Sequence, residues 1–454
     1  MVGIGGIGMQ ALADVLLGLG YKIAGSDIQD FPGRERLEGK GAKVIIGEQV
    51  AANVPADIEG LIYTSAAVRH NAKHPEIERA RAMGLPVWKR SEFIGVLMAD
   101  KIGIAVSGTH GKTTTSTLIT LMLQEGGLDP TALIGAEVHS LRGCGILGAS
   151  QYMVVEACEY DRAFLDMQPK IAVLTNIDAD HLDYYQDLNE IKEAFAEFLG
   201  ILPPDGLAVV CGDDSNILDI LLKAKTKVVK FGFGPDNDWI AKNVRYQNGK
   251  MEFEVDGIKT FLNFPGKHLV LDALAAVVVA KHLGVSDAAV KTVLENKFKG
   301  AARRFEILAH VKGVTFMDDY AHHPTEIAVT LDAARDYFKQ RKIRVVFQAH
   351  QYSRTRLLLP DFAKSFRAAD EVLVAPILAV RDSEEDIKSV STERLAAEIN
   401  NVSHNATAYM GFDEISHYLG DSLQSGDVVI SMGAGKNSDW IKEFIKDYPK
   451  LSQQ

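Results

Sequence analysis

Short apolar runs alternate with segments of helical periodicity along almost the whole chain. Runs such as "KIGIAVSG" (101–108) and "IAVLTNI" (171–177) are continuous and rich in Val, Ile and Leu, which is typical of strands buried on both faces of a parallel sheet. Near the N-terminus, Leu12, Val15 and Leu19 recur at the spacing of a helix face. This alternation predicts an α/β protein with parallel sheets.

A connecting stretch near residue 98 and a new series of strands and helices from about residue 300 predict three α/β domains at residues 1–98, 99–299 and 300–454. The stretch "SEFIGVLMADK" (91–101) is interpreted as the connection into the second domain. Inside that domain, residues 244–264 carry Asn-Gly and Asp-Gly pairs between alternating runs, which predicts consecutive antiparallel hairpins. A long helix follows, and the third domain begins near "KGAARRFE".

Composition narrows the class of protein. The chain has 454 residues, too many for one core, and 47% hydrophobic with 24% charged residues is ordinary for a globular enzyme. A net charge of −11 argues against nucleic-acid binding. Cys144, Cys158 and Cys211 lack metal-ligand spacing and fit a reducing compartment. Without a signal peptide or a membrane-length apolar run, we expect a cytoplasmic protein with no stable membrane association. The separate expectation for its oligomeric state is a monomer or a homodimer.

Glycines at the N-terminus form a candidate phosphate loop. Gly3-x-Gly5-x-x-Gly8 precedes a predicted helix, whose first amides would face an anion. The next strand, "YKIAGSD", places Asp27 where a Rossmann-like dinucleotide fold has its ribose-binding acid. The spacing suits NAD or another nucleotide. Only two residues precede the glycines, so we expect the first strand to be nearly absent and the true start to lie upstream or to have been trimmed.

A second phosphate loop is the strongest local signal. In "AVSGTHGKTTTSTLITLML" (105–123) a buried strand ends at Ser107, a glycine turn follows, and a helix begins at Lys112. This is a P-loop arrangement, one residue shorter than the usual form. Such loops bind ATP through backbone amides, with a lysine on the β and γ phosphates and a hydroxyl on Mg²⁺. The predicted ATP-binding residues are Gly108, Thr109, His110, Gly111, Lys112, Thr113 and Thr114.

Acids and histidines cluster where later strands end. Because ligands gather at the carboxyl ends of strands in open α/β sheets, Glu156 and the stretch "TNIDADHLD" should face the P-loop. Glu156 is a candidate Mg²⁺ ligand and His181 a second one, although a lone histidine more often caps or packs a helix. In the third domain, polar side chains follow two successive strands and the boundary stretch "AARRFE"; they are Asp319, His322, His323, His350, Arg354, Arg356, Arg303 and Arg304. Arginines there suit carboxylate or phosphate recognition.

Taken in order, the motifs GIGGIG, SGTHGKTTT, EACEYD, TNIDADHLD, RRFE, DDYAHHPTE, HQYSRTR and SMGAG resemble those of the Mur ligases from end to end. Within that family the chain is most similar to the branch that adds the first amino acid of the peptidoglycan stem peptide. The resemblance implies a Rossmann-like N-terminal domain that binds UDP rather than NAD, a central P-loop ATPase-type domain with added antiparallel hairpins, and a C-terminal Rossmann-like domain that binds the amino acid.

The resemblance also implies an activity and roles for residues. ATP would phosphorylate the lactyl carboxylate of UDP-N-acetylmuramate, and L-alanine would attack the acyl phosphate. The implied catalytic residues are Lys112, Asn176, His181, His322 and Arg354. Arg304 and Asp319 would join the P-loop in binding ATP, and Thr113, Glu156 and His181 would bind Mg²⁺. The implied substrate-binding residues are Gly5, Gly6, Ile7, Gly8, Asp27, Ser65, His323 and Arg356.

Several positions depart from the family pattern. Leu269 and Asp272 replace the asparagines that usually read adenine, and Gln351 replaces a frequent arginine. Lys436 stands where an aspartate is common. Phe195 falls by rough count where later-acting ligases carry a carbamylated lysine, which fits the alanine-adding branch.

Three alternatives stay open at this point. One is the recycling ligase that attaches the tripeptide L-Ala-γ-D-Glu-meso-diaminopimelate, since it shares almost every motif. Another is an NAD(P)-binding oxidoreductase with an accessory ATP domain. The third is a regulatory nucleotide-binding protein without catalysis, which the departures at Leu269, Asp272 and Gln351 would permit.

Overall fold

The N-terminal lobe is a small parallel sheet built around Val2. The structure is a computed structural model that describes residues 1–69 and 73–451. Strands β1 (Ala24–Asp27) and β2 (Lys43–Ile46) pair in parallel, as do β3 (Leu61–Tyr63) and β4 (Val87–Lys89). Val2 bridges Ser26 on one pair and Tyr63 on the other. The first strand, which the sequence predicted to be nearly absent, is therefore reduced to the single residue Val2 between the two strand pairs.

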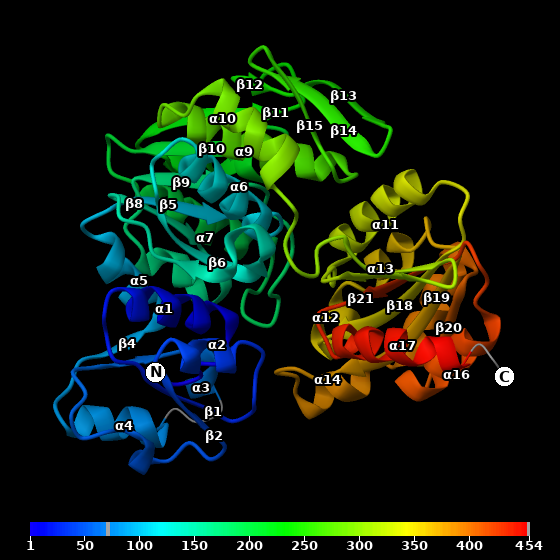
Figure 1. Ribbon diagram of the computed structural model, residues 1–454, viewed down its shortest axis with the longest axis horizontal. Coiled ribbons are helices and arrows are strands. Elements are labelled where there is room, and N and C mark those ends of the chain that lie inside the picture. The colour runs from blue at the N-terminus through cyan, green and yellow to red at the C-terminus, as the bar shows by residue number, and fades with distance from the viewer. Residues whose placement is uncertain (70–72, 452–454) are drawn as a thin grey trace.

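Helices cover this sheet and lead into the next domain (Figure 1). Residues 91–101, expected as a connection, are mostly helical, because α5 buries Ile94 and Met98. The helices of this lobe are α1 (Ile7–Gly18), α2 (Arg34–Gly39), α3 (Ser65–Arg69), α4 (Pro75–Ala82) and α5 (Arg90–Met98).

The central domain is an eight-stranded sheet in the order β12-β11-β10-β9-β5-β8-β6-β7, parallel except where β7 meets β6. Its strands are β5 (Ile102–Ser107), β6 (Thr131–Val138), β7 (Gly143–Ile146), β8 (Tyr152–Glu156), β9 (Ile171–Leu174), β10 (Leu207–Cys211), β11 (Lys227–Gly232) and β12 (Trp239–Ile240). Its helices are α6 (Lys112–Glu125), α7 (Leu188–Gly200), α8 (Ser215–Ile220), α9 (Lys267–His282) and α10 (Asp287–Thr292). The two inner strands β5 and β9 are almost entirely buried, as continuous apolar runs predict.

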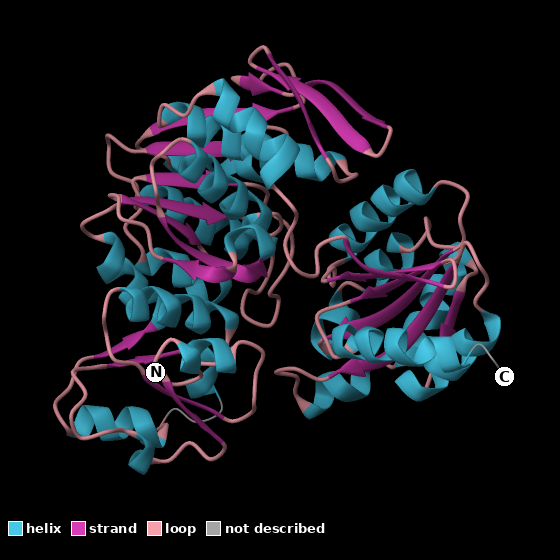
Figure 2. Cartoon of the chain, in the orientation of Figure 1, coloured by secondary structure: helices cyan, strands magenta, loops and turns pink. Residues whose placement is uncertain are grey.

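The predicted hairpins form a separate antiparallel sheet of β13 (Lys242–Gln247), β14 (Lys250–Val255) and β15 (Ile258–Leu262). Both turns are made by the Asn-Gly and Asp-Gly pairs: Asn248 and Gly249 have φ of 53° and 77°, and Asp256 and Gly257 have 47° and 79°. Two successive positive φ angles match the twist of a tight hairpin, which is why these residue pairs predicted it. The sheet lies at the upper edge of the central domain (Figure 2).

The C-terminal domain is a six-stranded sheet in the order β16-β17-β21-β18-β19-β20, with only β16 antiparallel. The strands are β16 (Glu306–Val311), β17 (Val314–Asp319), β18 (Ile343–His350), β19 (Glu371–Leu378), β20 (Ala406–Ala408) and β21 (Val428–Met432). The helices are α11 (Pro324–Phe338), α12 (Tyr352–Leu357), α13 (Leu359–Ser365), α14 (Glu384–Ser389), α15 (Thr392–Ser403), α16 (Phe412–Ser422) and α17 (Asn437–Leu451).

The predicted fold class, α/β in three domains, is confirmed, while the boundaries drawn at residues 98 and 299 stay predictions. The three cysteines are free. In the described part of the chain, none of the helices has both the length and the apolar character that crossing a membrane needs. For function, the decisive feature of the fold is that the carboxyl ends of β5 and β9 meet those of β17 and β18.

Candidate active site between the central and C-terminal domains

The second glycine loop has the predicted strand-loop-helix geometry. Strand β5 ends at Ser107 and helix α6 begins at Lys112. Gly108 and Gly111 have φ of +131° and +84°, and a Cβ on Gly111 would lie 2.3 Å from Oδ1 of Asp272. Both positions therefore require glycine, for backbone angle and for space.

Lys112 is held inside this loop. Its Nζ donates to the Gly108 carbonyl, to the Thr109 carbonyl at 3.0 Å, and to the two carboxylate oxygens of Glu159 at 3.1 and 2.9 Å. Burial opposes the charged form, but the Glu159 carboxylate outweighs it and raises the pKa of Lys112. The sequence analysis did not identify Glu159 as a site residue. The sign that could have found it is its place three residues after Glu156, just beyond the end of the same strand.

Thr113 and Glu156 lie together at the start of α6. The Thr113 hydroxyl donates to Oε2 of Glu156 at 2.9 Å, and the Gly135 amide donates to the same oxygen at 2.8 Å. Nε2 of His181 is 3.6 Å from Oε1 of Glu159. The other ring nitrogen of His181, Nδ1, is buried without a hydrogen-bond partner among the described residues. Hydroxyl, carboxylate and imidazole donors thus surround the P-loop, a set that suits a divalent cation.

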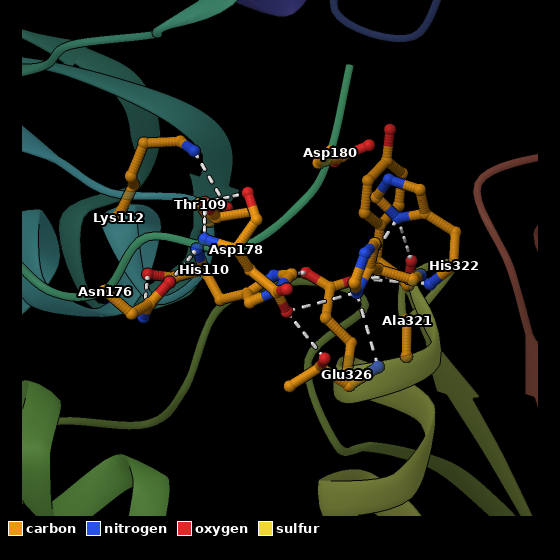
Figure 3. A network of polar contacts seen from close by, with 12 residues as sticks. Thr109, His110, Lys112, Asn176, Asp178, Asp180, Ala321, His322 and Glu326 are labelled. Atoms are coloured by element: carbon orange, nitrogen blue, oxygen red, sulfur yellow. Dashed lines mark hydrogen bonds and ion pairs between the residues drawn. The ribbon is translucent and has the colours of Figure 1, made fainter. Parts of the chain in front are cut away.

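Asn176 braces the P-loop at His110, as Figure 3 shows. Its Oδ1 accepts from the His110 amide at 2.8 Å and its Nδ2 donates to the His110 carbonyl at 3.0 Å. The His110 ring lies between Asp178, at 3.3 Å from Nε2, and Glu326, at 3.1 Å from Nδ1. Burial alone would lower its pKa, but hydrogen bonds to these carboxylates raise the pKa of His110 to about 9. A positively charged histidine therefore joins the two domains at neutral pH.

Three further contacts connect the same two domains. Arg354 donates through Nε and Nη2 to Oδ1 of Asp180 at 3.0 and 2.9 Å. The Thr325 hydroxyl donates to Oδ2 of Asp178 at 2.6 Å. Nε2 of His323 lies 3.1 Å from the Ala179 carbonyl oxygen. The segment 178–180 after β9 is thus the surface against which the C-terminal domain packs.

The histidines at the strand ends of the C-terminal domain stay neutral. Burial lowers the pKa of His322 to about 3 and that of His350 to about 4. Nδ1 of His322 is 3.0 Å from the Tyr320 carbonyl oxygen, and the two rings are 6.1 Å apart. Neutral imidazoles near the P-loop can exchange hydrogen bonds with a substrate without adding charge.

A cavity of about 530 Å³ opens between these elements, within the range of nucleotide sites. The P-loop lines one side, and Arg304 and Asp319 from the C-terminal domain line another. Asp319 accepts from the Phe305 and Ala321 amides at 2.7 and 2.8 Å, and burial raises its pKa to about 6. The atypical residues Leu269 and Asp272 also line this cavity.

The first glycine loop lies on the N-terminal domain. The Gly5 amide donates to Oδ2 of Asp27 at 2.8 Å, and α1 begins at Ile7 directly after Gly6. Ser65 opens α3 directly after Thr64, whose amide donates to the Val2 carbonyl beside the loop. The structure therefore brings the predicted glycines and Asp27 together and places Ser65 in the neighbouring turn.

Other predicted or atypical positions lie outside the cluster. Arg356 is partly exposed, and its Nη2 is 3.3 Å from Oδ1 of Asp386 on α14. Gln351 is buried before α12 with φ of +84°. The Lys436 amide donates to Gln348. Phe195 is fully buried and its ring is 5.3 Å from that of Phe164, so this position of α7 belongs to the core.

Comparison with known proteins places the chain in a family. Three family models match it: "Mur ligase family, catalytic domain" over residues 1–102, "Mur ligase middle domain" over 106–280, and "Mur ligase, glutamate ligase domain" over 303–435. The UDP-N-acetylmuramate--L-alanine ligase of Caldanaerobacter subterraneus subsp. tengcongensis is 40% identical over 456 residues, covering 99% of this chain and 97% of that relative. The protein of the same name from a Sulfurihydrogenibium species is 40% identical over 450 residues, covering 98% of this chain and 97% of that relative.

Solved structures of similar proteins agree with these family matches. The UDP-N-acetylmuramate-alanine ligase MurC of Thermotoga maritima superposes with a TM-score of 0.83 at 27% identity, covering 99% of this chain and 98% of that one. The murein peptide ligase of Psychrobacter arcticus shares the fold, with a TM-score of 0.71 at 23% identity and coverage of 98% of both chains. Matches to all three domain models, together with relatives of this identity along the full chain, show that the protein belongs to the Mur ligase family of ATP-dependent ligases.

Proposed function

We propose that this chain joins L-alanine to the lactyl carboxylate of UDP-N-acetylmuramate, at the expense of ATP and through an acyl phosphate. The observation that carries the proposal is the meeting of an ATP-type P-loop with the strand ends of the C-terminal domain across segment 178–180. The names of the relatives that are 40% identical support the choice of substrates. The family finding also argues against the NAD(P)-dependent oxidoreductase.

The P-loop end of the cavity would hold the triphosphate and a magnesium ion. Thr113, Glu156 and His181 fit the ion by their donor chemistry, and the orphaned Nδ1 of His181 is a buried nitrogen that lacks a protein partner in the described part of the chain. Bound Mg²⁺ would neutralise charge on the phosphates and orient them. Arg304 and Asp319 would complete the nucleotide site from the C-terminal domain.

The chemistry then needs positioning more than covalent help. A lactyl carboxylate oxygen attacks the γ-phosphorus, the bond to the bridging oxygen breaks, and ADP leaves. The amine of L-alanine attacks the acyl carbon, gives up a proton, and expels inorganic phosphate. Lys112 would stabilise charge on the transferring phosphoryl group, and Asn176 would fix the loop that presents it.

The remaining roles are proposals from the same scheme. Neutral His322 and the Arg354 guanidinium would line the reacting centre, with His323 on the amino-acid side. The substrate-binding role of Arg356, which pairs with Asp386 outside the cluster, stays a prediction from the family resemblance. Gly5 to Gly8, Asp27 and Ser65 would hold the uridine nucleotide. The cytoplasmic location and a monomeric or homodimeric state stay predictions from the sequence.

Phosphate release tests the proposal. The purified chain is given ATP, Mg²⁺ and UDP-N-acetylmuramate, with L-alanine or with L-Ala-γ-D-Glu-meso-diaminopimelate, and blanks lack the uridine nucleotide. We expect nucleotide-dependent release with L-alanine and none with the tripeptide. Release with the tripeptide alone would move the chain to the recycling ligase, and no release with either would contradict ligase activity.

A further inference from the structure

Two histidines and an aspartate meet where the P-loop packs against the C-terminal domain. Nε2 of His110 lies 3.3 Å from Oδ2 of Asp178, a contact visible in Figure 3, and Nδ1 of His323 lies 3.7 Å from the same oxygen. In the part of the chain that the structure describes, this is the one group of at least three histidine, cysteine or acidic side chains whose ligand atoms all lie within 4.8 Å of one another. None of the three belongs to the magnesium site proposed above.

The spacing of these three atoms fits a single small cation. Bonds from zinc to a histidine nitrogen or a carboxylate oxygen are about 2.1 Å long, so two ligand atoms of a tetrahedral site lie about 3.4 Å apart. The distances from Oδ2 of Asp178 to the two histidine nitrogens, 3.3 and 3.7 Å, are close to that value. The distance between the two nitrogens is at most 4.8 Å, which a small side-chain movement can reduce.

The second ring nitrogen of each histidine is held by an acceptor. Nδ1 of His110 lies 3.1 Å from Oε1 of Glu326, and Nε2 of His323 lies 3.1 Å from the Ala179 carbonyl oxygen. Because a carbonyl oxygen only accepts, Nε2 of His323 carries the proton and its Nδ1 keeps a lone pair. Histidines that bind metals almost always donate their other ring N–H to a carboxylate or a backbone carbonyl. Both kinds of outer contact are therefore in place.

The remaining contacts leave room for an ion to enter. The hydrogen bond that Nδ1 of His323 accepts from the Thr325 amide is long, at 3.3 Å, and the Asp178 side chain is 34% exposed to solvent. We propose that His110, Asp178 and His323 bind a divalent transition metal ion such as Zn²⁺, with water as the fourth ligand. Two imidazoles favour such an ion over Mg²⁺, which prefers oxygen ligands. The ion would displace the Nε2 proton of His110 to solvent, so that one cation replaces another between Asp178 and Glu326.

An occupied site would inhibit the ligase reaction. His110 and Asp178 belong to the central domain and His323 to the C-terminal domain, so the ion would link the two domains through bonds to the metal. The proposed function assigns His110 to ATP and His323 to the amino-acid side, and a bound ion would withdraw both histidines from those substrates. This inhibition rests on the proposed function, whereas metal binding does not.

Metal titration of the full chain tests the site without turnover. Co²⁺, whose visible absorption is strong in a four-coordinate site, is added in saturating Mg²⁺ and is then displaced by Zn²⁺. We expect His323→Gln and Asp178→Asn each to weaken binding of both ions by at least about 100-fold, because even the loss of an outer contact costs up to about that factor. The matched control is His139→Gln, which removes an exposed histidine whose Nε2 is also 3.3 Å from a carboxylate, that of Glu306, and should bind like wild type.

Several results would overturn the proposal. Wild-type affinity of Asp178→Asn for Co²⁺ and Zn²⁺ would remove the site, and this variant decides the matter even if His323→Gln does not fold, since asparagine keeps the shape of aspartate. Loss of the Co²⁺ signal in His181→Ala would place the ion at the magnesium site instead.

Phosphate release tests the consequence for activity. Zn²⁺ at the concentration that fills the site should inhibit wild type and His139→Gln alike, and EDTA followed by fresh Mg²⁺ should restore both. Full activity of wild type with the site filled would refute the inhibition. Because the Co²⁺ titration needs no turnover, it tests metal binding even if the chain does not use L-alanine.

Discussion

The Asp272 carboxylate should lower the stability of the folded, ligand-free protein above neutral pH, and Asp272→Asn should restore that stability. Asp272 is buried on α9, forms no ion pair among the described residues, and abuts Gly111 of the P-loop. Burial raises the pKa of its carboxyl to about 7, although Arg304 and His110 oppose the shift. Asparagine has the same shape and no charge, so the substitution isolates the electrostatic effect.

The size of the effect follows from linkage. The unfolded chain loses the Asp272 proton near pH 3.8, while the folded chain keeps it to about pH 7. Below pH 3.8 both states are protonated and there is no penalty; above pH 7 the folded state carries a buried carboxylate at full cost. The difference between these pKa values corresponds to about 4 kcal/mol at pH 8. The Asp272→Asn variant should therefore be more stable than wild type by most of this free energy at pH 8, and by almost none of it at pH 4.

Calorimetry between pH 5 and pH 8.5 measures the gain. The transition that ATP moves upward identifies the central domain, since a ligand stabilises the domain it binds. At pH 8 its midpoint should rise by on the order of 10 °C in Asp272→Asn. Asp236→Asn, which removes an exposed carboxylate of the same domain, is the control and should show no pH-dependent gain.

A constant difference between Asp272→Asn and wild type at every pH would refute the reasoning, because it would mean that the carboxyl does not titrate differently in the folded state. A less stable variant at pH 8 would refute it as well. The same charge lies in the proposed ATP cavity, so the variant should also bind ATP more tightly at pH 8 than wild type does. Equal ATP affinity at that pH would separate the stability effect from the nucleotide site.

Two more substitutions test the P-loop. Lys112→Ala should abolish phosphate release, a loss on the order of several kcal/mol of transition-state stabilisation, while UDP-N-acetylmuramate still binds; near-normal turnover would contradict the role of the loop. His181→Ala should raise the Mg²⁺ concentration needed for half-maximal activity, measured after stripping with EDTA, because the buried Nδ1 of His181 is the ligand it removes. An unchanged Mg²⁺ dependence would assign His181 to packing against Tyr160, whose ring centroid is 5.0 Å away.

The features that sequence predicted well are local ones. The P-loop is specified by glycines that must adopt positive φ, and the hairpins by Asn-Gly and Asp-Gly pairs that form their own turns. The N-cap of α11 is similar: Pro324 and Glu326 follow His323, which caps the helix together with Glu326. In each case the residues that determine the geometry are neighbours in the chain, so one sequence is enough to find them.

The features that the sequence did not predict are contacts between segments far apart in the chain. His110 and Glu326 are 216 residues apart, and Asp180 and Arg354 are 174 apart, yet each pair connects the two domains. Motif spacing placed the residues at strand ends but gave no sign of which acid would face which base. Glu326 carried only the local signature of a helix first turn, and its pairing with the P-loop histidine depends on how two sheets pack.

Most charges around the proposed active site are paired within the protein, including those of residues that are proposed to act on the substrates. Around the site, Glu159 neutralises Lys112 and Asp180 neutralises Arg354. Arg90 and Asp272 depart from this rule, since neither has an ion-pair partner in the described ranges. One is a cation beside the first phosphate loop and the other an acid beside the second. A triphosphate bound in the cavity would favour the protonated form of Asp272. ATP binding should therefore be accompanied by proton uptake at Asp272 above neutral pH, where the carboxyl is otherwise ionised.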